Sequence, residues 1–305
     1  MSTQHSSQRI AITGSTGFIG RALTAHLTAL GHHVVALTRR GKSTAGQAIS
    51  WDPARGELAP GALAGIDAVI NLAGESVAQR WTDDVKREIR DSRVKGTTLL
   101  ARTIQAMETP PRVFLSGSAI GIYGDRGDEL LDESSAPGRG FLADVARAWE
   151  DATAPLDRAD VRVVHLRTGT VLGADGGALE KMLPPFRLGF GGKIGSGTQV
   201  MSWIALEDWT RAASFLLDAG QVKGAVNMVA PVPVTNADFT HALGHALGRP
   251  TIIPVPEAAI RLMFGEMGEA TILASQRVVP TRLLGAGFGF RYETLEAALP
   301  TVLAS

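Results

Sequence analysis

The sequence predicts an α/β protein built on a doubly wound parallel sheet, and three observations carry this prediction. Short runs rich in valine and isoleucine recur along the first half of the chain. Longer segments with helical spacing separate them, and the runs themselves are apolar throughout. Continuous apolar runs are typical of strands covered by helices on both faces. Strand–helix–strand repetition favours parallel strands joined by right-handed crossovers.

The first half of the chain supplies most of the expected elements. The candidate strands cover residues 9–13, 33–38, 68–72, 112–116 and 161–167, with a further strand ending at residues 51–53. The candidate helices between them cover residues 18–30, 83–107 and 141–156. We therefore expect a Rossmann-type doubly wound domain over residues 1–172.

The pattern changes after residue 172. Residues 173–197 are rich in glycine and proline, and helical segments follow near 206–217, 236–247 and 257–274. A short run near 225–230 reads as a strand that rejoins the main sheet. We therefore expect residues 173–305 to form a smaller, partly discontinuous C-terminal substrate lobe.

Composition excludes several classes of function. The 305 residues include 30 Lys+Arg and 30 Asp+Glu, for a formal net charge of zero, and no cysteine. Balanced charge argues against nucleic-acid binding, which needs a basic face. Without cysteine there are no disulfides, thiolate metal sites or cysteine nucleophiles, and we expect no metal. No apolar run reaches about 18 residues, and the polar start lacks a signal-peptide core, so we expect a cytoplasmic protein with no membrane contact.

A glycine motif follows the first candidate strand, with Gly14, Gly17 and Gly20 in the sequence GSTGFIG. In such a motif the first glycine permits a tight turn, the second lets backbone approach a pyrophosphate, and the third lets the helix pack closely. The helix N-terminus then faces the anion. Because the motif follows a strand and opens a helix, it predicts dinucleotide binding. A purely structural glycine turn is the alternative.

The end of the second candidate strand indicates which dinucleotide is bound. Arg39 and Arg40 stand about 20 residues beyond Gly20, where an NAD enzyme usually carries an acidic residue for the ribose 2′-hydroxyl. Two guanidinium groups instead suit a 2′-phosphate. These residues predict NADP(H) as the cofactor, and a solvated basic turn is the alternative.

Several longer segments resemble one known group of proteins. TGSTGFIG at 13–20 resembles the opening of extended short-chain dehydrogenases/reductases, the group that contains nucleoside-diphosphate-sugar epimerases. NLAGE at 71–75, SGSAIGIYG at 116–124 and NMVAPVP at 227–233 are similar to an atypical subfamily described as "epimerase family protein". That subfamily has a C-terminal segment of unknown function. The resemblance covers about residues 9–302 and defines no substrate.

The resemblance implies a set of cofactor contacts. It places the first glycine turn on the pyrophosphate, the two arginines on the 2′-phosphate and residues 71–74 along the adenosine ribose. It also implies an acidic contact to adenine from Asp52, for which a structural turn is the alternative. In full, the expected cofactor-binding residues are Gly14, Ser15, Thr16, Gly17, Phe18, Ile19, Arg39, Arg40, Asp52, Asn71, Leu72, Ala73, Gly74, Ser116, Thr168 and Gly169.

The group's usual catalytic pair is missing from this chain. That chemistry uses Tyr-x-x-x-Lys on a helix, where the ammonium group lowers the tyrosine pKa so that the phenolate can take a proton. The chain has two tyrosines. Four residues after Tyr123 stands Gly127, and four after Tyr292 stands Glu296. The standard acid–base pair is therefore absent.

Other hydroxyls are the remaining catalytic candidates. The group's trailing glutamate matches Glu150, which places Leu142 and Ala146 at the tyrosine and lysine positions. Ser118 follows the strand at 112–116, where the group's serine orients a substrate hydroxyl, and Tyr123 lies in the next turn. We expect Ser118 and Tyr123 to be catalytic. A hydroxyl that only hydrogen-bonds to backbone is the alternative for each.

These observations predict an NADP(H)-dependent oxidoreductase that transfers a hydride between NADPH and a carbonyl or secondary alcohol. A nucleoside-diphosphate-sugar epimerase and a non-catalytic NADP(H) sensor stay open as alternatives. The expected partner is a small-molecule substrate, anionic or nucleotide-linked, on which the glycine-rich loop 189–197 with Lys193 would close. By analogy with relatives that pair through the helices at 83–107 and 141–156, a homodimer is also expected.

Overall fold

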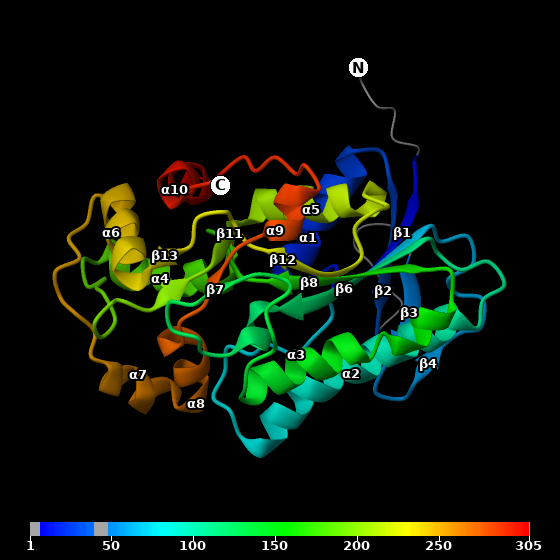
Figure 1. The fold of residues 1–305 in the computed structure, drawn as a ribbon, viewed down its shortest axis with the longest axis horizontal. Coiled ribbons are helices and arrows are strands. Elements are labelled where there is room, and N and C mark those ends of the chain that lie inside the picture. The colour runs from blue at the N-terminus through cyan, green and yellow to red at the C-terminus, as the bar shows by residue number, and fades with distance from the viewer. Residues whose placement is uncertain (1–6, 40–47, 305) are drawn as a thin grey trace.

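The computed structural model describes residues 7–39 and 48–304. Its main sheet has the strand order β12-β8-β6-β5-β1-β2-β3-β4 (Figure 1). The strands are β1 (Arg9–Thr13), β2 (His33–Thr38), β3 (Ala48–Asp52), β4 (Glu57–Leu58), β5 (Ala68–Asn71), β6 (Val113–Ala119), β8 (Arg162–Thr168) and β12 (Gly224–Met228). All neighbours pair in parallel except β4, which runs antiparallel to β3 at one edge. The predicted doubly wound parallel sheet is confirmed.

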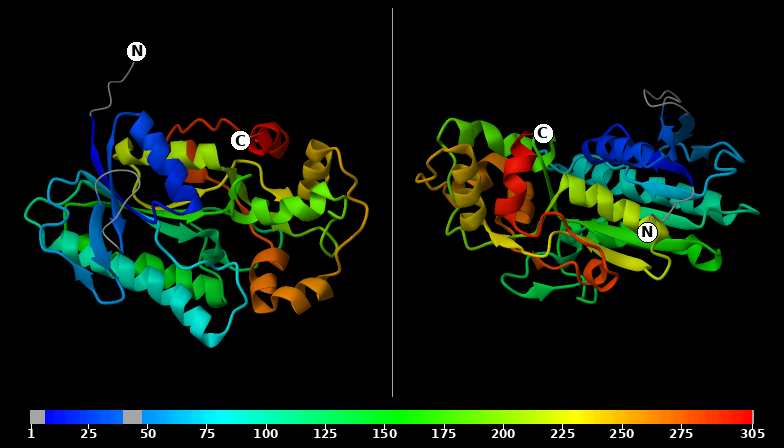
Figure 2. Two further views of the ribbon diagram at one scale, coloured as in Figure 1. Left: turned by 180° about the vertical axis from the view of Figure 1, so that it is seen from behind. Right: turned by 90° about the horizontal axis from the view of Figure 1, so that it is seen from above.

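Helices cover both faces of this sheet (Figures 1 and 2). One face carries α1 (Phe18–Ala29) and α5 (Leu206–Asp218), and the other carries α2 (Asp83–Gln105) and α3 (Phe141–Asp151). Side chains alternate between the two faces of a strand. Accordingly Ile10 and Ile12 of β1 join the core beneath α1 and α5, whereas Ala11 joins the core beneath α2. This two-sided burial is the physical reason that the strands are continuously apolar.

Local sequence signals explain where α2 begins and which face it buries. The Thr82 side chain accepts a hydrogen bond from the backbone N–H of Val85, which satisfies one of the free donors of the first turn. Asp83 and Asp84 place negative charge near the positive end of the helix dipole. Leu100 and Ile104, one turn apart, are fully buried against the sheet.

The expected helix at 141–156 is shorter than predicted. The α-helix ends at Asp151, and a 3₁₀ helix, η2 (Ala154–Arg158), takes over with Pro155 in its first turn. Proline has no backbone N–H, and its ring clashes with the carbonyl group four residues earlier, here that of Asp151, which disfavours continuation of the α-helix.

The C-terminal lobe has its own apolar core. It packs α4 (Gly177–Arg187), α6 (Asn236–Leu247) and α10 (Leu295–Ala304) around residues such as Trp203 and Leu243. Two short two-stranded sheets belong to this lobe. In one, β9 (Thr170–Gly173) pairs with β11 (Trp203–Ala205), and in the other, β10 (Val200–Met201) pairs with β13 (Val234–Thr235). Because α5 and β12 instead belong to the main sheet's core, the lobe is interrupted in sequence. The boundary at residue 172 stays a prediction.

The last part of the chain runs from the C-terminal lobe back to the turns that follow the main sheet. An outer segment contains α7 (Glu257–Phe264), α8 (Glu266–Gly268) and a π-helix, η3 (Glu269–Leu273). It continues into β14 (Arg277–Val278), which pairs with β7 (Leu130–Leu131), and then α9 (Thr281–Gly285). Across the described residues, every helix is too short or too polar to cross a membrane.

We expect Gly20→Ala to lower the free energy of unfolding by about 1–3 kcal/mol. A Cβ at Gly20 would sit 2.1 Å from the carbonyl oxygen of Gly14, so backbone must move to accept it. Gly285→Ala is the matched control, because a Cβ there meets nothing within 4 Å. Thermal unfolding of both variants measures the difference, and equal midpoints would contradict this packing.

Candidate cofactor and active site

The first βα turn has the geometry that an anion site requires. Gly14 has φ +68°, and a Cβ on it would lie 2.9 Å from the carbonyl carbon of Leu72, so only glycine fits. The N–H of Gly17 bonds to the carbonyl oxygen of Gly14 at 3.0 Å and closes the turn. Thr16 and Gly17 are exposed. The N-terminus of α1 is therefore open to a ligand at the carboxyl edge of the sheet.

A chain of buried hydrogen bonds joins the end of β1, next to this turn, to the end of β5. The Thr13 hydroxyl donates to Asn71 Oδ1 at 2.7 Å and accepts from the backbone N–H groups of Leu72 and Ala73 at 3.0 and 3.1 Å. Asn71 Nδ2 donates in turn to Thr97 Oγ1 at 2.8 Å. The side chain of Asn71 thus faces the interior and holds the loop, while Ala73 and Gly74 border solvent.

The predicted adenosine-side residues are only partly described. Arg39 is exposed at the end of β2, and Arg40 lies outside the described residues. The Asp52 carboxylate accepts the backbone N–H groups of Ala54 and Arg55 at 3.0 and 3.2 Å. Through these two hydrogen bonds Asp52 stabilises the turn between β3 and β4. Its contact with adenine stays a prediction.

The carboxyl end of β6 carries the predicted serine in a defined orientation. Ser118 is 4% exposed, and its hydroxyl donates to Glu150 Oε1 at 2.7 Å. Ser116 lies on the same strand and is fully buried. On β8, Thr168 donates to the carbonyl of Leu166 at 3.1 Å. A Cβ on the next residue, Gly169, would lie 2.6 Å from the carbonyl oxygen of Ser202, so backbone approaches closely there.

Glu150 forms a bidentate ion pair with Arg167. Arg167 Nε and Nη2 donate to its two carboxylate oxygens at 2.8 and 2.9 Å. Burial alone would raise the pKa of Glu150, but the hydrogen bonds and charge of Arg167 hold that pKa below its ordinary value. Burial lowers the pKa of the neighbouring His165 despite the charge of Glu150. Glu150 is therefore an ionised carboxylate that accepts the hydrogen bond of the Ser118 hydroxyl.

Tyr123 lies inside the same cluster. It is fully buried, its hydroxyl donates to Asn227 Oδ1 at 2.8 Å, and it accepts from Arg167 Nη1 at 2.9 Å. Burial raises the pKa of Tyr123, against the opposing effect of Arg167. Asn227 continues the chain by donating to the carbonyl of Val279 at 3.0 Å. A catalytic role for Tyr123 stays a prediction; in this geometry it links β12 to the site.

The positions of the missing pair are apolar in three dimensions as well. Leu142 packs toward Gly121, and Ala146 is 2% exposed in a cluster with Ile120 and Ile122. Sequence reasoning used Glu150 only to align the chain and missed its bonds to Ser118 and Arg167. One signal existed, because an arginine inside the apolar run VRVVHLR needs a buried partner.

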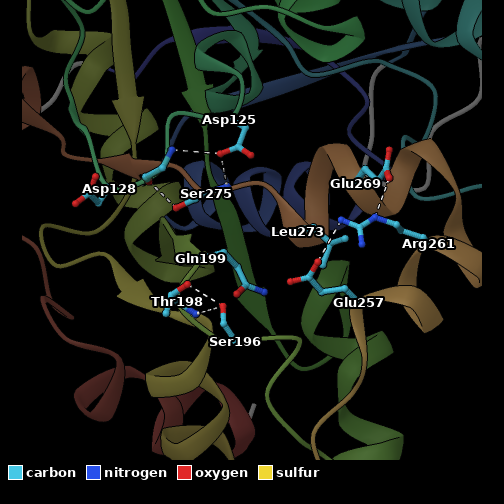
Figure 3. Close-up of a pocket in the computed structure, with 11 residues that line it drawn as sticks. Asp125, Asp128, Ser196, Thr198, Gln199, Glu257, Arg261, Glu269, Leu273 and Ser275 are labelled. Atoms are coloured by element: carbon cyan, nitrogen blue, oxygen red, sulfur yellow. Dashed lines mark hydrogen bonds and ion pairs between the residues drawn. The ribbon is translucent and has the colours of Figure 1, made fainter.

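A cavity of about 490 Å³ opens beyond the turn that contains Tyr123 (Figure 3). Loop residues Asp125 and Asp128 line one side, and Glu257 and Arg261 of α7 line another. Lys193 is not among its lining residues; its ammonium donates to the carbonyl of Ser196 at 3.4 Å. Within the described residues, no group of three or more His, Asp or Glu side chains could hold a metal ion.

Fold and site together define a nucleotide-binding α/β protein with an extended C-terminal lobe. Residues 10–228 match the model of the NAD dependent epimerase/dehydratase family, and residues 255–302 match a domain of unknown function, DUF1731. The chain belongs to the NAD-dependent epimerase/dehydratase family, as the resemblance predicted.

Individual relatives agree with this assignment. The epimerase family protein MT2273 of Mycobacterium tuberculosis is 43% identical over 95% of this chain and 96% of its own. The human epimerase family protein SDR39U1 is 39% identical over 97% of this chain and 100% of its own. A crystal structure of human SDR39U1 (isoform2) with NADPH superimposes with a TM-score of 0.88 at 36% identity, over 97% of this chain and 99% of that one. A UDP-glucose 4-epimerase of Thermus thermophilus in complex with NAD shares the fold, with a TM-score of 0.77 at 19% identity over 97% of this chain and 98% of that one.

We expect Glu150→Gln to lower the free energy of unfolding at neutral pH by about 3–5 kcal/mol, because it leaves Arg167 buried without its partner charge. The folded-state pKa of Glu150 is depressed, so its contribution is present above the unfolded value and is lost as pH falls through the folded value. The difference between variant and wild type should therefore shrink in acid, in denaturant titrations across pH. The exposed Glu293→Gln is the control, and a loss independent of pH would contradict the pairing.

Proposed function

We propose that this protein is an NADP(H)-dependent oxidoreductase that acts on a carbonyl or secondary alcohol. One observation carries the proposal: the open turn at Gly14–Gly17 and the oriented hydroxyl of Ser118 lie at the same edge of the sheet. The strand order places β5 alone between β1 and β6, so these two strand ends are about 10 Å apart. A dinucleotide spans such a distance, with its pyrophosphate on the turn and its nicotinamide beside Ser118.

The residues present fit the cofactor. The φ of +68° at Gly14 forms the tight turn that a pyrophosphate site uses, and Thr16 and Gly17 at the start of α1 are exposed. The exposed guanidinium of Arg39 supports a 2′-phosphate. The human relative that was crystallised with NADPH supports the same choice.

Bound NADP(H) would supply hydride chemistry, and the chain's own groups would position the substrate. The Ser118 hydroxyl gives its hydrogen to Glu150, so its lone pairs remain for a donor on the ligand. Ser118 therefore orients a substrate hydroxyl by accepting its hydrogen bond. We assign Tyr123 a positioning role through Arg167, because its hydroxyl is already engaged on both sides.

One observation bears on both alternatives. Epimerisation of a nucleotide sugar needs a group that deprotonates a sugar hydroxyl, and the apolar Leu142 and buried Ala146 occupy the places of the usual pair. The same replacement favours a non-catalytic NADP(H) sensor as the second candidate. Turnover separates the two, since a sensor binds NADPH tightly and oxidises it with no carbonyl compound.

Removing the Arg39 guanidinium tests the cofactor choice. We expect Arg39→Ala to weaken NADPH binding by about 10–100-fold, the effect of losing one charge-assisted hydrogen bond, and to leave NADH binding unchanged. Isothermal titration with both dinucleotides measures this, with the exposed Arg249→Ala as control. An equal loss for NADPH and NADH would sink the 2′-phosphate assignment.

Removing the Ser118 hydroxyl tests the reaction. We expect Ser118→Ala to lower kcat by about 10–100-fold for the oxidation of secondary alcohols with NADP⁺, because the oxygen that accepts the hydrogen bond of the substrate hydroxyl is lost. NADPH affinity should be unchanged. Ser134→Ala, in an exposed turn, is the control. Wild-type turnover in Ser118→Ala would refute the assigned role.

A further inference from the structure

Arg93 of α2 carries a guanidinium group with one edge left unpartnered by the protein. Its Nη1 donates to the backbone carbonyl oxygens of Glu75 and Ile89, both at 2.9 Å. Among the described residues, Nε and Nη2 find no acceptor, and the guanidinium forms no ion pair. Both nitrogens reach solvent, because the described side-chain atoms that are buried without a partner are Gln8 Oε1 and Thr24 Oγ1.

The packing around Arg93 holds this free edge in place. Its Cζ lies 5.1 Å from the centroid of the Trp149 ring, a cation–π contact. A Cβ on the exposed Gly74 would lie 3.1 Å from the same atom. Burial lowers the pKa of Arg93 to about 10, against the opposing charge of Glu75, so the group stays protonated at neutral pH. A partly dehydrated charge with unused donors is costly, and an anionic ligand would offset that cost.

Direct contacts join Arg93 to both parts of the site that the proposed function uses. On one side it touches Gly74, which belongs to the predicted cofactor contacts. On the other it lies on the ring of Trp149, and a Cβ at Gly117, the residue before Ser118, would lie 2.6 Å from that ring. Helices α2 and α3, which carry Arg93 and Trp149, run side by side on one face of the sheet (Figure 1).

The free edge has the geometry that binds a carboxylate. The Nε–H and one Nη2–H of an arginine form a fork that matches the two oxygens of one carboxylate. Arg167 of this protein uses that fork on Glu150, at 2.8 and 2.9 Å. Arg93 presents the same fork with no carboxylate on it. One positive charge suits a carboxylate monoanion better than a phosphate dianion, because the nearby Glu75 adds negative charge of its own.

We propose that the free fork of Arg93 binds a carboxylate of the substrate. The proposal rests on the proposed function, whose substrate it narrows to a hydroxy acid or an oxo acid. The hydroxyl or carbonyl of such a molecule would lie at Ser118, with its carboxylate on Arg93. The anionic group expected from the sequence thus has its partner on α2. The ammonium of Lys193, in the glycine-rich loop, instead donates to the carbonyl of Ser196.

Calorimetric titration of the full chain saturated with NADP⁺ tests this proposal, because NADP⁺ cannot reduce a ketone and binding is measured without turnover. The probes are 2-oxobutanoate and 2-oxobutanamide, an uncharged molecule of similar size. We expect 2-oxobutanoate to bind about 10–100-fold more weakly to Arg93→Gln than to wild type, the effect of losing a charge-assisted contact. Arg93→Lys should recover only part of this loss, since an ammonium keeps the charge without the fork.

The matched controls separate binding from a purely structural role. The affinity for 2-oxobutanamide should be the same in wild type, Arg93→Gln and Arg93→Lys, whereas a structural loss would weaken both probes alike. Arg102→Gln, at an exposed position of the same helix, should bind both probes like wild type. Equal weakening of the two probes by Arg93→Gln, or no binding of 2-oxobutanoate at millimolar concentration, would overturn the proposal.

Two further titrations distinguish other sources of the anion and the failure of the proposed function. Weaker NADP⁺ binding in Arg93→Gln would assign the fork to a cofactor phosphate, and tighter Arg93-dependent binding of inorganic phosphate than of 2-oxobutanoate would assign it to phosphate. Either result would overturn the substrate carboxylate. Failure of the wild type to bind NADP⁺ would overturn the oxidoreductase. Arg93-dependent binding of 2-oxobutanoate to the cofactor-free chain would then leave the carboxylate site standing, and its absence would overturn both.

Discussion

The ion pair between Arg167 and Glu150 is the interaction on which the rest of the site depends. Both side chains are almost withdrawn from solvent, with 9% and 12% of their side-chain surface exposed. Two charges this buried are costly unless their hydrogen bonds are complete. Glu150 also accepts a hydrogen bond from the Ser118 hydroxyl, and Arg167 also donates one to the Tyr123 hydroxyl. The ends of β6 and β8, the turn after β6 and α3 are therefore fixed relative to one another.

The same network ties the C-terminal part of the chain to the sheet. Tyr123 bonds to Asn227 on β12, and the backbone N–H of Asn227 donates to Glu133 at 2.9 Å. Burial raises the pKa of Glu133, against the opposing effect of its backbone donors. Gln276 adds a second tie by donating to the carbonyls of Ile120 and Gly124 at 3.1 and 2.9 Å. The turn after β6 is thus held both to β12 and to the segment before β14.

Sequence reasoning succeeded where the signal is local. The apolar runs predicted the parallel strands because both faces of each are covered, and the spacing of Gly14, Gly17 and Gly20 predicted a turn whose backbone crowding the structure makes explicit. It did not find contacts between distant residues. Nothing in the neighbourhood of Tyr123 indicates that its hydroxyl meets Asn227, or that α7 brings Glu257 against the glycine-rich loop. Such contacts depend on how the lobe packs, which a linear pattern does not encode.

The position of the nicotinamide ring in a crystal structure of the NADPH complex tests the central claim most directly. We predict the pyrophosphate on the Gly14–Gly17 turn and the ring at the carboxyl end of β6. Nicotinamide C4 should then face the space beside Ser118 Oγ, close enough for the carbon of a substrate hydroxyl that contacts Ser118 to come within about 3–3.5 Å, the separation of a reactive pair. A ring turned away from Ser118, or NADPH bound away from the Gly14 turn, would contradict the proposed oxidoreductase.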